Sequence, residues 1–504
     1  MFKHKIVRSA LILTAANIIT RLLGFLYRIF MSKSIGAEGM GLYQLISPVY
    51  MLVWAFSSAG LSTAVSKLTA EQKGCGRTEN MYPIVKCACL LSVVLSVIAS
   101  AVVYFFSPYI CERFLGDVRT VLSLRILCIC FPFMAAGSCI RGWFYGIQEA
   151  KVPASCQVLE QCTRMIVVYM LSFKMLNKGL EAACAMAVIG MAAGEIISFI
   201  YVIICSFLRP KVKSKASISY MSAASMIFAL ALPLTLNRIT GSLLSTVENL
   251  LIPTRLQLFG LSRSSSVALY GQLCGMAMPL IMFPSSLLTS LATALMPAVS
   301  EASAKGNTSS LCSSVEKSLA FTAITGIGTA GLFICLPYEL GEVIYSQREI
   351  GYMLRLLGII CPFIYLQVTL GGILNGLGKQ VFIFVANLAA SAFNICFIWI
   401  FVPKYGIEAF LLGWFIGIVA VDLMSLFVIS ASIKIRLYFN NLLLKPLAAI
   451  GFSALSFKFF AERLTINFFS IVPLMCAMVF MGGLYIAIVT LSGAMPIAPR
   501  GKGV

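Results

Sequence analysis

Apolar runs of about twenty residues recur along the whole chain, separated by short segments that hold most of the charged side chains. About 20 apolar residues are needed for a helix to cross the hydrocarbon core of a bilayer, because each residue rises about 1.5 Å. The pattern therefore predicts about fourteen membrane-spanning helices. Their approximate bounds are 9–31, 43–66, 84–107, 121–147, 154–174, 181–208, 221–252, 267–297, 318–337, 351–377, 381–402, 406–432, 442–460 and 467–491. Very short turns at 148–153 and 378–380 predict two helical hairpins.

The composition supports a membrane-embedded chain. Of the 504 residues, 60% are hydrophobic and only 11% are charged, whereas about 25% of the residues in a soluble domain are charged. The apolar runs are continuous rather than alternating, which argues against an outer-membrane barrel. The N-terminus resembles a signal peptide, but its apolar run exceeds twenty residues and lacks a clear cleavage site. We therefore predict an all-α integral membrane protein with a retained first helix.

The net charge of +20 comes from Lys and Arg residues scattered through short loops, which favours membrane topology over nucleic-acid binding as its cause. The alternation of spans places 20 of the 38 Lys and Arg residues on the side of the two termini and 11 on the opposite side. Positively charged loops remain preferentially in the cytoplasm. The sequence thus predicts a multi-pass membrane protein with both termini cytoplasmic.

Cysteine and histidine usage argues against metal or histidine chemistry. Most of the 17 cysteines lie in apolar runs, where cysteine acts as a small hydrophobe. The one histidine, His4, lies in the N-terminal tail. No loop outside the spans is long enough to suggest a catalytic domain. We therefore predict a transporter rather than an enzyme, with no metal and no cofactor other than a coupling ion, H⁺ or Na⁺.

The two halves of the chain resemble each other. Residues 124–146 align without gaps on residues 354–376 with eight of 23 positions identical, including Pro132 with Pro362 and Gly146 with Gly376. Weaker echoes pair Asn17-x-x-Thr20 with Asn237-x-x-Thr240 and Ala64-Val65-Ser66 with Ala298-Val299-Ser300. Because six spans separate equivalent helices, the halves are predicted to be parallel repeats around a central cavity, with alternating access between them.

This repeat gives the predicted domain organisation. Four segments follow from it: an N-terminal six-helix lobe at 1–208, a basic cytoplasmic linker at 209–220, a C-terminal six-helix lobe at 221–433, and two extra helices with a cytoplasmic tail at 434–504.

Polar stripes on the first span of each half are the candidate substrate site. Spacings near i, i+4, i+7 and i+11 place such residues on one face of a helix. The first stripe is Asn17, Arg21, Gly24 and Arg28, and the second is Asn237, Gly241, Ser245 and Glu248. Two guanidinium groups about 10 Å apart suit separated anionic oxygens such as those of a pyrophosphate. The alternative is that Arg21 pairs with an acid such as Glu248 while Arg28 extends to the membrane surface.

Further charged residues lie within the predicted spans. Glu160 and Arg164 are spaced for an intrahelical ion pair, and equally for a relay. Glu195 and Asp422 are isolated acids that suit either proton or sodium coupling or a buried hydrogen bond. Arg125 and Arg355 repeat symmetrically near helix ends and favour structural roles. Arg141 and Arg238 lie toward the cytoplasmic half, where they either line the inner mouth or extend to the surface.

The segments "RLLGFLYR" and "SIGAEGMGLYQL" (34–45) resemble the start of the stage V sporulation protein B family of polysaccharide transporters. That family belongs to the multidrug/oligosaccharidyl-lipid/polysaccharide exporter superfamily, which includes the lipid II flippase. Arg21-Leu-Leu-Gly24-Phe25 matches the flippase motif Arg-x-x-Gly-Phe-x-Arg, whereas Arg28 lies one residue beyond the motif's second arginine. The second span carries Tyr43, Gln44 and Trp54 where the lipid II flippases have charged residues.

The resemblance implies transport of an undecaprenyl-pyrophosphate-linked saccharide from the inner to the outer leaflet of the bacterial cytoplasmic membrane. In the sporulating branch this saccharide would be a peptidoglycan precursor for the spore cortex. The partners would be this lipid-linked substrate, the bilayer and cell-wall synthesis enzymes. A cation-coupled multidrug exporter of the same superfamily is the alternative function, and a membrane-embedded polymerase is a third that lacks a nucleophile with a supporting base.

Overall fold

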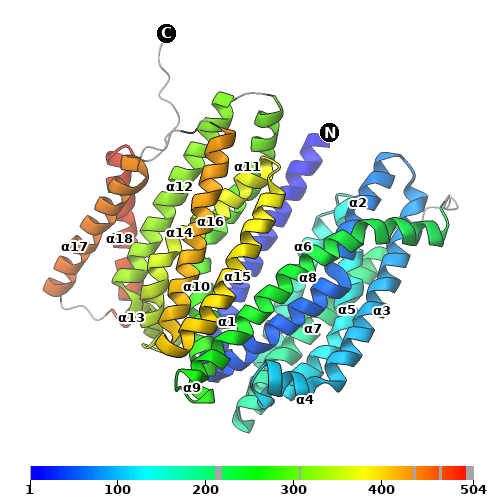
Figure 1. The fold of residues 1–504 in the computed structure, drawn as a ribbon, viewed down its shortest axis with the longest axis horizontal. Coiled ribbons are helices and arrows are strands. Elements are labelled where there is room, and N and C mark those ends of the chain that lie inside the picture. Colours follow the sequence, from blue (N-terminus) through cyan, green and yellow to red (C-terminus); the bar gives the residue numbers. More distant parts are fainter. Residues whose placement is uncertain are drawn as a thin grey trace. The chain divides into compact units, whose positions relative to one another are not determined.

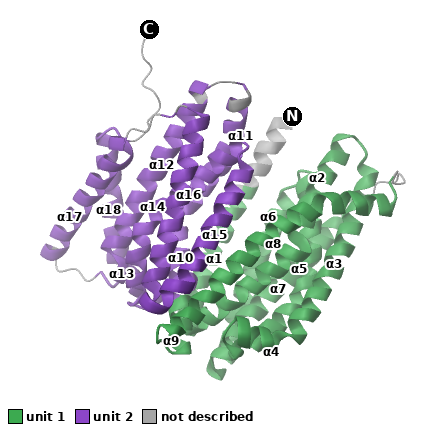
Figure 2. Cartoon of the chain, viewed as in Figure 1, with its two compact units in different colours: residues 1–271 green, residues 272–504 purple. Residues whose placement is uncertain are grey.

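The computed structural model describes residues 2–209, 218–305, 308–433, 435, 439–464 and 468–494. Helices make up all of the regular secondary structure in these ranges. The chain forms two compact units, residues 1–271 and 272–504, which Figure 2 shows in different colours. The all-helical, multi-pass membrane character predicted from the apolar runs is confirmed.

Unit 1 contains the helices of the first half and the first long helix of the second. They are α1 (Phe2–Trp54), η1 (Ala55–Ala59), α2 (Gly60–Gly74), η2 (Thr78–Asn80), α3 (Met81–Phe105), α4 (Ser107–Tyr109), η3 (Ile110–Phe114), η4 (Val118–Thr120), α5 (Val121–Gly146), α6 (Lys151–Met175), η5 (Leu176–Lys178), α7 (Leu180–Phe207), α8 (Tyr220–Leu258) and α9 (Arg263–Tyr270). In this unit α5 is the most buried helix and packs against α2, α3 and α7.

Unit 2 contains the remaining helices, labelled in Figure 1. They are η6 (Gly271–Ala277), which begins at the last residue of unit 1, then α10 (Met278–Met282), α11 (Ser285–Ala304), α12 (Thr308–Cys335), α13 (Pro337–Tyr345), α14 (Ile350–Gly376), α15 (Gln380–Tyr405), α16 (Ile407–Ser432), η7 (Asn440–Leu444), α17 (Lys445–Leu464) and α18 (Ile471–Leu491). Helix α14 is the centre of this unit and packs against α11, α12 and α16, beside which it runs in Figure 1.

The described residues contain 12 segments long and apolar enough to cross a membrane, rather than fourteen. One of these segments, Ala15–Gly74, covers both of the first two predicted spans. Helix α6, the predicted fifth span, is not among the 12, and it carries Glu160 and Arg164 together with charged residues at its ends. The predicted total of fourteen therefore stays a prediction.

The largest local difference from the sequence prediction concerns the connection between the first two spans. Helix α1 runs through this segment, and Gly36 alone interrupts it, with a φ of 69° that glycine adopts without steric strain. The predicted eighth span is also interrupted, since a turn at Phe283 and Pro284 separates α10 from α11. Proline removes the backbone donor that would continue the helix.

The sequence repeat is visible in how α5 and α14 are built. Each helix ends at its repeated glycine and is followed by a left-handed residue, Gln148 (φ 62°) or Gly378 (φ 73°). The backbone hydrogen bonds of the two turns also match. In unit 1 the N–H groups of residues 147, 148 and 149 donate to the carbonyl oxygens of 143, 145 and 144, respectively. In unit 2 the N–H groups of 377, 378 and 379 donate to those of 373, 375 and 374. This recurrence explains both predicted hairpins.

The repeated glycines mark the same close helix crossing in each unit. An added Cβ at Gly146 would lie 2.5 Å from the carbonyl oxygen of Ser66, and one at Gly376 would lie 2.8 Å from that of Met296. Ser66 therefore corresponds to Met296, whereas the sequence echo pairs it with Ser300. The echo is displaced by four residues, about one helical turn, so it retains the same helix face. The full lobes at 1–208 and 221–433 stay a prediction.

A charged cluster ties the region after the α1 kink to the start of α5. Arg119 donates to Asp117 from Nη2 (2.6 Å) and to Glu38 from Nη1 (2.8 Å). Burial raises the pKa of Asp117, but hydrogen bonds from the side chain and backbone of Arg119 outweigh burial and leave this pKa below its ordinary value. The positive charge of Arg263 acts in the same direction.

Candidate functional site

The first predicted stripe is exposed in its first half and contacts a neighbouring helix in its second half. On α1, Asn17 and Arg21 are exposed, whereas Gly24 and Arg28 are half-buried. Gly24 lies against α6, where an added Cβ would be 3.7 Å from the amide nitrogen of Gln161. Within the described part of the chain Arg21 forms no ion pair, so the alternative, in which Arg21 pairs with an acid such as Glu248, is not seen. Its guanidinium is therefore available to an anion.

The second predicted stripe lies on α8, also within unit 1. Asn237, Gly241 and Ser245 are exposed, and Glu248 is half-buried. Little of α8 is buried: in its most apolar stretch of 18 residues, only 11% are buried. The exposed polar residues of α1 and α8 thus belong to the same compact unit, although the sequence assigns them to different halves.

A second polar cluster, which we call the inner cluster, lies where α1, α5, α6 and α7 pack together. Arg164 donates to Glu160 at 2.8 Å, as their spacing predicts. Glycines on α7 make room for this pair, because an added Cβ at Gly194 would lie 2.8 Å from the carbonyl oxygen of Glu160 and one at Gly190 would lie 3.1 Å from that of Arg164.

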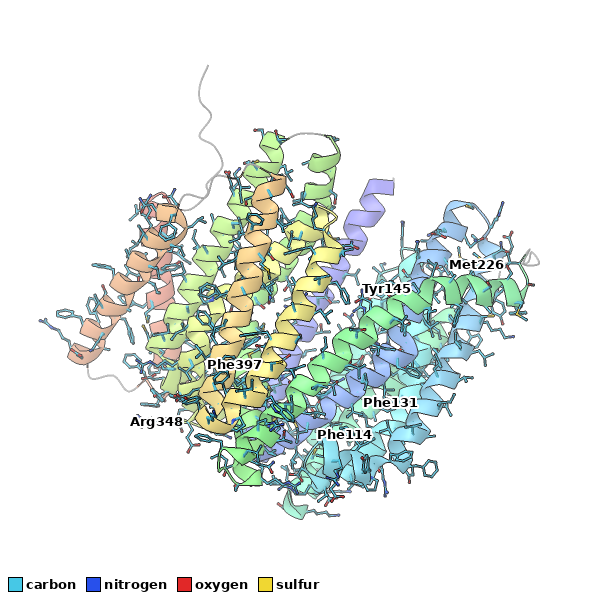
Figure 3. All side chains as sticks on the ribbon, viewed as in Figure 1. Phe114, Phe131, Tyr145, Met226, Arg348 and Phe397 are labelled. Atoms are coloured by element: carbon cyan, nitrogen blue, oxygen red, sulfur yellow. The ribbon has the colours of Figure 1, made fainter. Side chains whose placement is uncertain are left out.

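Glu195 completes the inner cluster from α7. It is 4% exposed, and its Oε1 accepts a hydrogen bond from the phenol of Tyr50 at 2.6 Å. One side of Tyr50 contacts Phe131, labelled in Figure 3, with ring centroids 6.4 Å apart. Arg141 on α5 donates to Ser198, one helical turn beyond Glu195, at 3.2 Å. Two acids and two arginines therefore share this interior.

Several buried polar atoms of this region have no hydrogen-bond partner among the described residues: Tyr27 Oη, Gln157 Oε1, Arg164 Nε and Glu195 Oε2. Buried polar groups are normally paired with protein or ordered water. Unpaired donors and acceptors in a protein interior can therefore take up water or a small ion. The sequence missed Tyr27 and Tyr50 because tyrosine is common in apolar spans and carries no spacing signal.

Asp422 stands apart from the inner cluster, on α16 in unit 2. It is 2% exposed, and neither carboxyl oxygen has a hydrogen-bond partner in the described residues. Helix α16 packs against α14 and α15, and the neighbouring α15 buries Asn394. An unsatisfied carboxyl group inside a membrane protein is costly and is therefore typical of function.

Comparisons with known proteins identify the family to which the chain belongs. A family model described as polysaccharide biosynthesis protein matches residues 6–303, and one described as MatE matches residues 257–400. Stage V sporulation protein B of Bacillus subtilis (strain 168) is 28% identical over 449 residues, covering 87% of each chain. Lipid II flippase MurJ of the same organism is 25% identical over 414 residues, covering 76% of this chain and 74% of that protein.

Two solved structures share the fold. Lipid II flippase MurJ in an inward closed conformation has a TM-score of 0.71 with 17% identity, covering 96% of this chain and 98% of that one. A multidrug resistance MATE family transporter in an inward-facing conformation has a TM-score of 0.65 with 16% identity, covering 84% and 98%.

Proposed function

The chain belongs to the polysaccharide biosynthesis protein family of membrane transporters, and from that premise we propose that it flips an undecaprenyl-pyrophosphate-linked saccharide. The proposed direction is from the inner to the outer leaflet of the cytoplasmic membrane, with both termini cytoplasmic. The proposed mechanism is alternating access between the two sequence repeats. A peptidoglycan precursor, in a spore-forming cell one for the cortex, is the substrate that the similarity to stage V sporulation protein B supports.

The single observation that carries this proposal is the exposed Arg21 on a membrane helix. An arginine within the hydrocarbon region costs about 2.5–3.5 kcal/mol on insertion scales unless it faces water, protein or a ligand. Arg21 makes no ion pair in the described residues. A pyrophosphate group would satisfy its planar set of donors, because arginine binds phosphate oxygens in a bidentate manner.

Acids in both units suit the coupling step. We propose that Glu160, Arg164 and Glu195 of the inner cluster, together with Asp422, carry the protons or sodium ions that drive the cycle. The unpartnered atoms of Glu195 and Asp422 support this role, since a coupling ion has to find oxygens that the resting protein leaves unsatisfied. Cell-wall synthesis enzymes, which supply and consume such substrates, are the proposed partners.

The test is a flipping assay on the full chain reconstituted in liposomes with a fluorescent polyprenyl-pyrophosphate-linked disaccharide. We expect Arg21→Ala to lower the flipping rate at least tenfold, because one charge-assisted phosphate contact is worth about 1.5–3 kcal/mol. Arg113→Ala, which removes an exposed arginine from η3, is the matched control and should flip at the wild-type rate. Failure of the reconstituted wild-type protein to flip the fluorescent lipid would refute the proposal.

A cation-coupled multidrug exporter is the second candidate function. The MatE match over residues 257–400 and the buried acids favour it. Overexpression in a drug-sensitive strain separates the two functions. Raised resistance that disappears with Asp422→Asn, together with no lipid flipping, would favour drug export.

A further inference from the structure

Trp54 and Arg238 meet across two helices of unit 1, far from each other in the sequence. The guanidinium carbon of Arg238 on α8 lies 6.0 Å from the centroid of the Trp54 ring, at the end of α1. Arg238 is exposed and Trp54 is half-buried. Among the described residues no carboxylate pairs with Arg238, and none of them accepts a hydrogen bond from its guanidinium.

Both residues lie near the middle of long helical stretches. Arg238 lies about midway along the 39 residues of α8, and Trp54 lies about midway between the kink at Gly36 and the end of α2 at Gly74. An arginine far from either end of a membrane helix cannot easily reach the interface, so it must face water, protein or a ligand. Among the described residues, the indole ring of Trp54 is the contact that the structure gives this guanidinium.

The backbone near the pair is fixed by a close helix crossing. An added Cβ at Gly60 would lie 2.0 Å from Thr235 Oγ1 and 2.8 Å from the carbonyl oxygen of Ala231. This contact between α2 and α8 lies within two turns of Trp54 on one helix and one turn of Arg238 on the other. Trp54 also immediately precedes the π-helical turn η1, a feature often found at functional sites.

The contact with Trp54 uses none of the hydrogen-bonding capacity of Arg238 toward an oxygen acceptor. The N–H groups of a guanidinium bind phosphate oxygens. One helical turn further along α8, the buried hydroxyl of Ser242 has no hydrogen-bond partner in the described residues. A guanidinium edge and a hydroxyl one turn apart match the adjacent oxygens of a phosphate or pyrophosphate group.

We propose that Arg238 and Ser242 form a phosphate subsite, with Trp54 as the residue that positions the guanidinium. The assignment rests on the proposed function and places a second phosphate contact on α8, separate from Arg21 on α1. Ordinary membrane phospholipids also carry phosphate, so the ligand class is a membrane-embedded phosphate ester. The favoured member of that class is the pyrophosphate of the lipid-linked substrate.

The experiment measures binding of geranylgeranyl pyrophosphate to the full chain in phosphatidylcholine nanodiscs, with geranylgeraniol as the uncharged comparison. We expect Arg238→Gln to weaken pyrophosphate binding at least tenfold and to leave geranylgeraniol binding unchanged. Trp54→Leu should weaken it about threefold through misplacement of the guanidinium, and Trp54→Phe should restore most of that loss. Arg113→Gln is the matched control and should bind like the wild type.

The possible outcomes distinguish a failure of the subsite from a failure of the proposed function. Pyrophosphate binding that falls with Arg21→Gln but not with Arg238→Gln would overturn the subsite while leaving the proposed function intact. Wild-type protein that binds the pyrophosphate no better than the alcohol would overturn both. Phosphatidylglycerol that displaces the probe at equal concentration would overturn the substrate assignment. Equal losses for Trp54→Phe and Trp54→Leu would overturn the positioning role.

Discussion

The phenol of Tyr50 on α1 donates a 2.6 Å hydrogen bond to Glu195 on α7, across 145 residues of sequence. This bond satisfies one oxygen of a carboxyl group that is 4% exposed, while the other oxygen stays unpaired among the described residues. The bond joins the part of α1 that follows the interruption at Gly36 to the inner cluster. A change in the protonation of Glu195 would therefore act first on this part of α1.

Tyr50→Phe tests the worth of that bond. Hydrogen bonds between membrane helices average about 0.6 kcal/mol, and a carboxyl acceptor raises the value, so we expect a loss of about 1 kcal/mol in the free energy of unfolding. The measurement is unfolding by sodium dodecyl sulfate in mixed micelles. Glu195→Gln retains an acceptor and should lose less. A double variant whose loss equals the sum of the single losses would show that the two side chains are not coupled.

Gly41 tests the contact between α1 and α9. An added Cβ would lie 2.0 Å from the carbonyl oxygen of Val267, and Gly271 makes a similar approach, 2.1 Å from the carbonyl oxygen of Ala37. Overpacking of this kind costs about 1–3 kcal/mol, so we expect Gly41→Ala to lower the thermal unfolding midpoint in detergent. Gly482→Ala, on α18 with nothing within 4 Å, is the control and should be neutral or slightly stabilising. Equal midpoints for the two variants would contradict the close contact.

Much of the fold follows from the sequence because hydropathy and repeats report directly on helices in a membrane. The match between residues 124–146 and 354–376 predicted two equivalent helices, and the structure gives them equivalent turns at Gln148 and Gly378. The helical structure on both sides of Gly36 could not be predicted from the sequence. A glycine in the left-handed region can end a helix or interrupt it for one residue, and the packing around it decides between these. The sequence also could not show that Ser66 corresponds to Met296 rather than to Ser300, because a shift of four residues, about one helical turn, keeps the same helix face.

The candidate site was predictable only where its residues are close in sequence. The Glu160–Arg164 pair follows from its i, i+4 spacing and is present at 2.8 Å. The Tyr50–Glu195 bond and the contact of Arg238 with Trp54 join separate helices, and no spacing in one sequence reports such pairs. Arg21 was singled out by its chemistry, yet its exposure depends on how α1 packs on α6.

Asp117 predicts a pH dependence of stability. Its folded-state pKa is depressed below the unfolded value of about 3.9, so the ionised form stabilises the fold at neutral pH. That contribution is complete above the unfolded pKa and disappears as the pH falls through the folded pKa. Arg119→Gln removes the guanidinium donors and keeps the backbone N–H that also lowers this pKa, and we expect a loss of about 2 kcal/mol in the free energy of unfolding at pH 7.

The measurement compares unfolding midpoints of wild type and Arg119→Gln between pH 7 and pH 3. The difference between the two proteins should narrow below about pH 4, because protonated Asp117 no longer gains from Arg119. Arg113→Gln, an exposed arginine in η3, should follow the wild type at every pH. A difference that stays constant across this range would assign the loss to packing rather than to the charge of Asp117.

Substitution of Asp422 distinguishes a role in ion coupling from a structural role. Both of its oxygens are unsatisfied among the described residues, so Asp422→Asn removes an ionisable group without breaking a hydrogen bond seen in the structure. We expect the variant to fold with an unfolding midpoint at or above that of the wild type. If Asp422 carries the coupling ion, flipping in liposomes should lose its response to an imposed proton or sodium gradient while substrate binding stays unchanged.

A structural role for Asp422 predicts the reverse, a lower unfolding midpoint with the gradient response retained. Asn394→Ala on the adjacent helix is the companion variant, and it should alter the ion preference only if the buried carboxyl group takes its ion between α15 and α16.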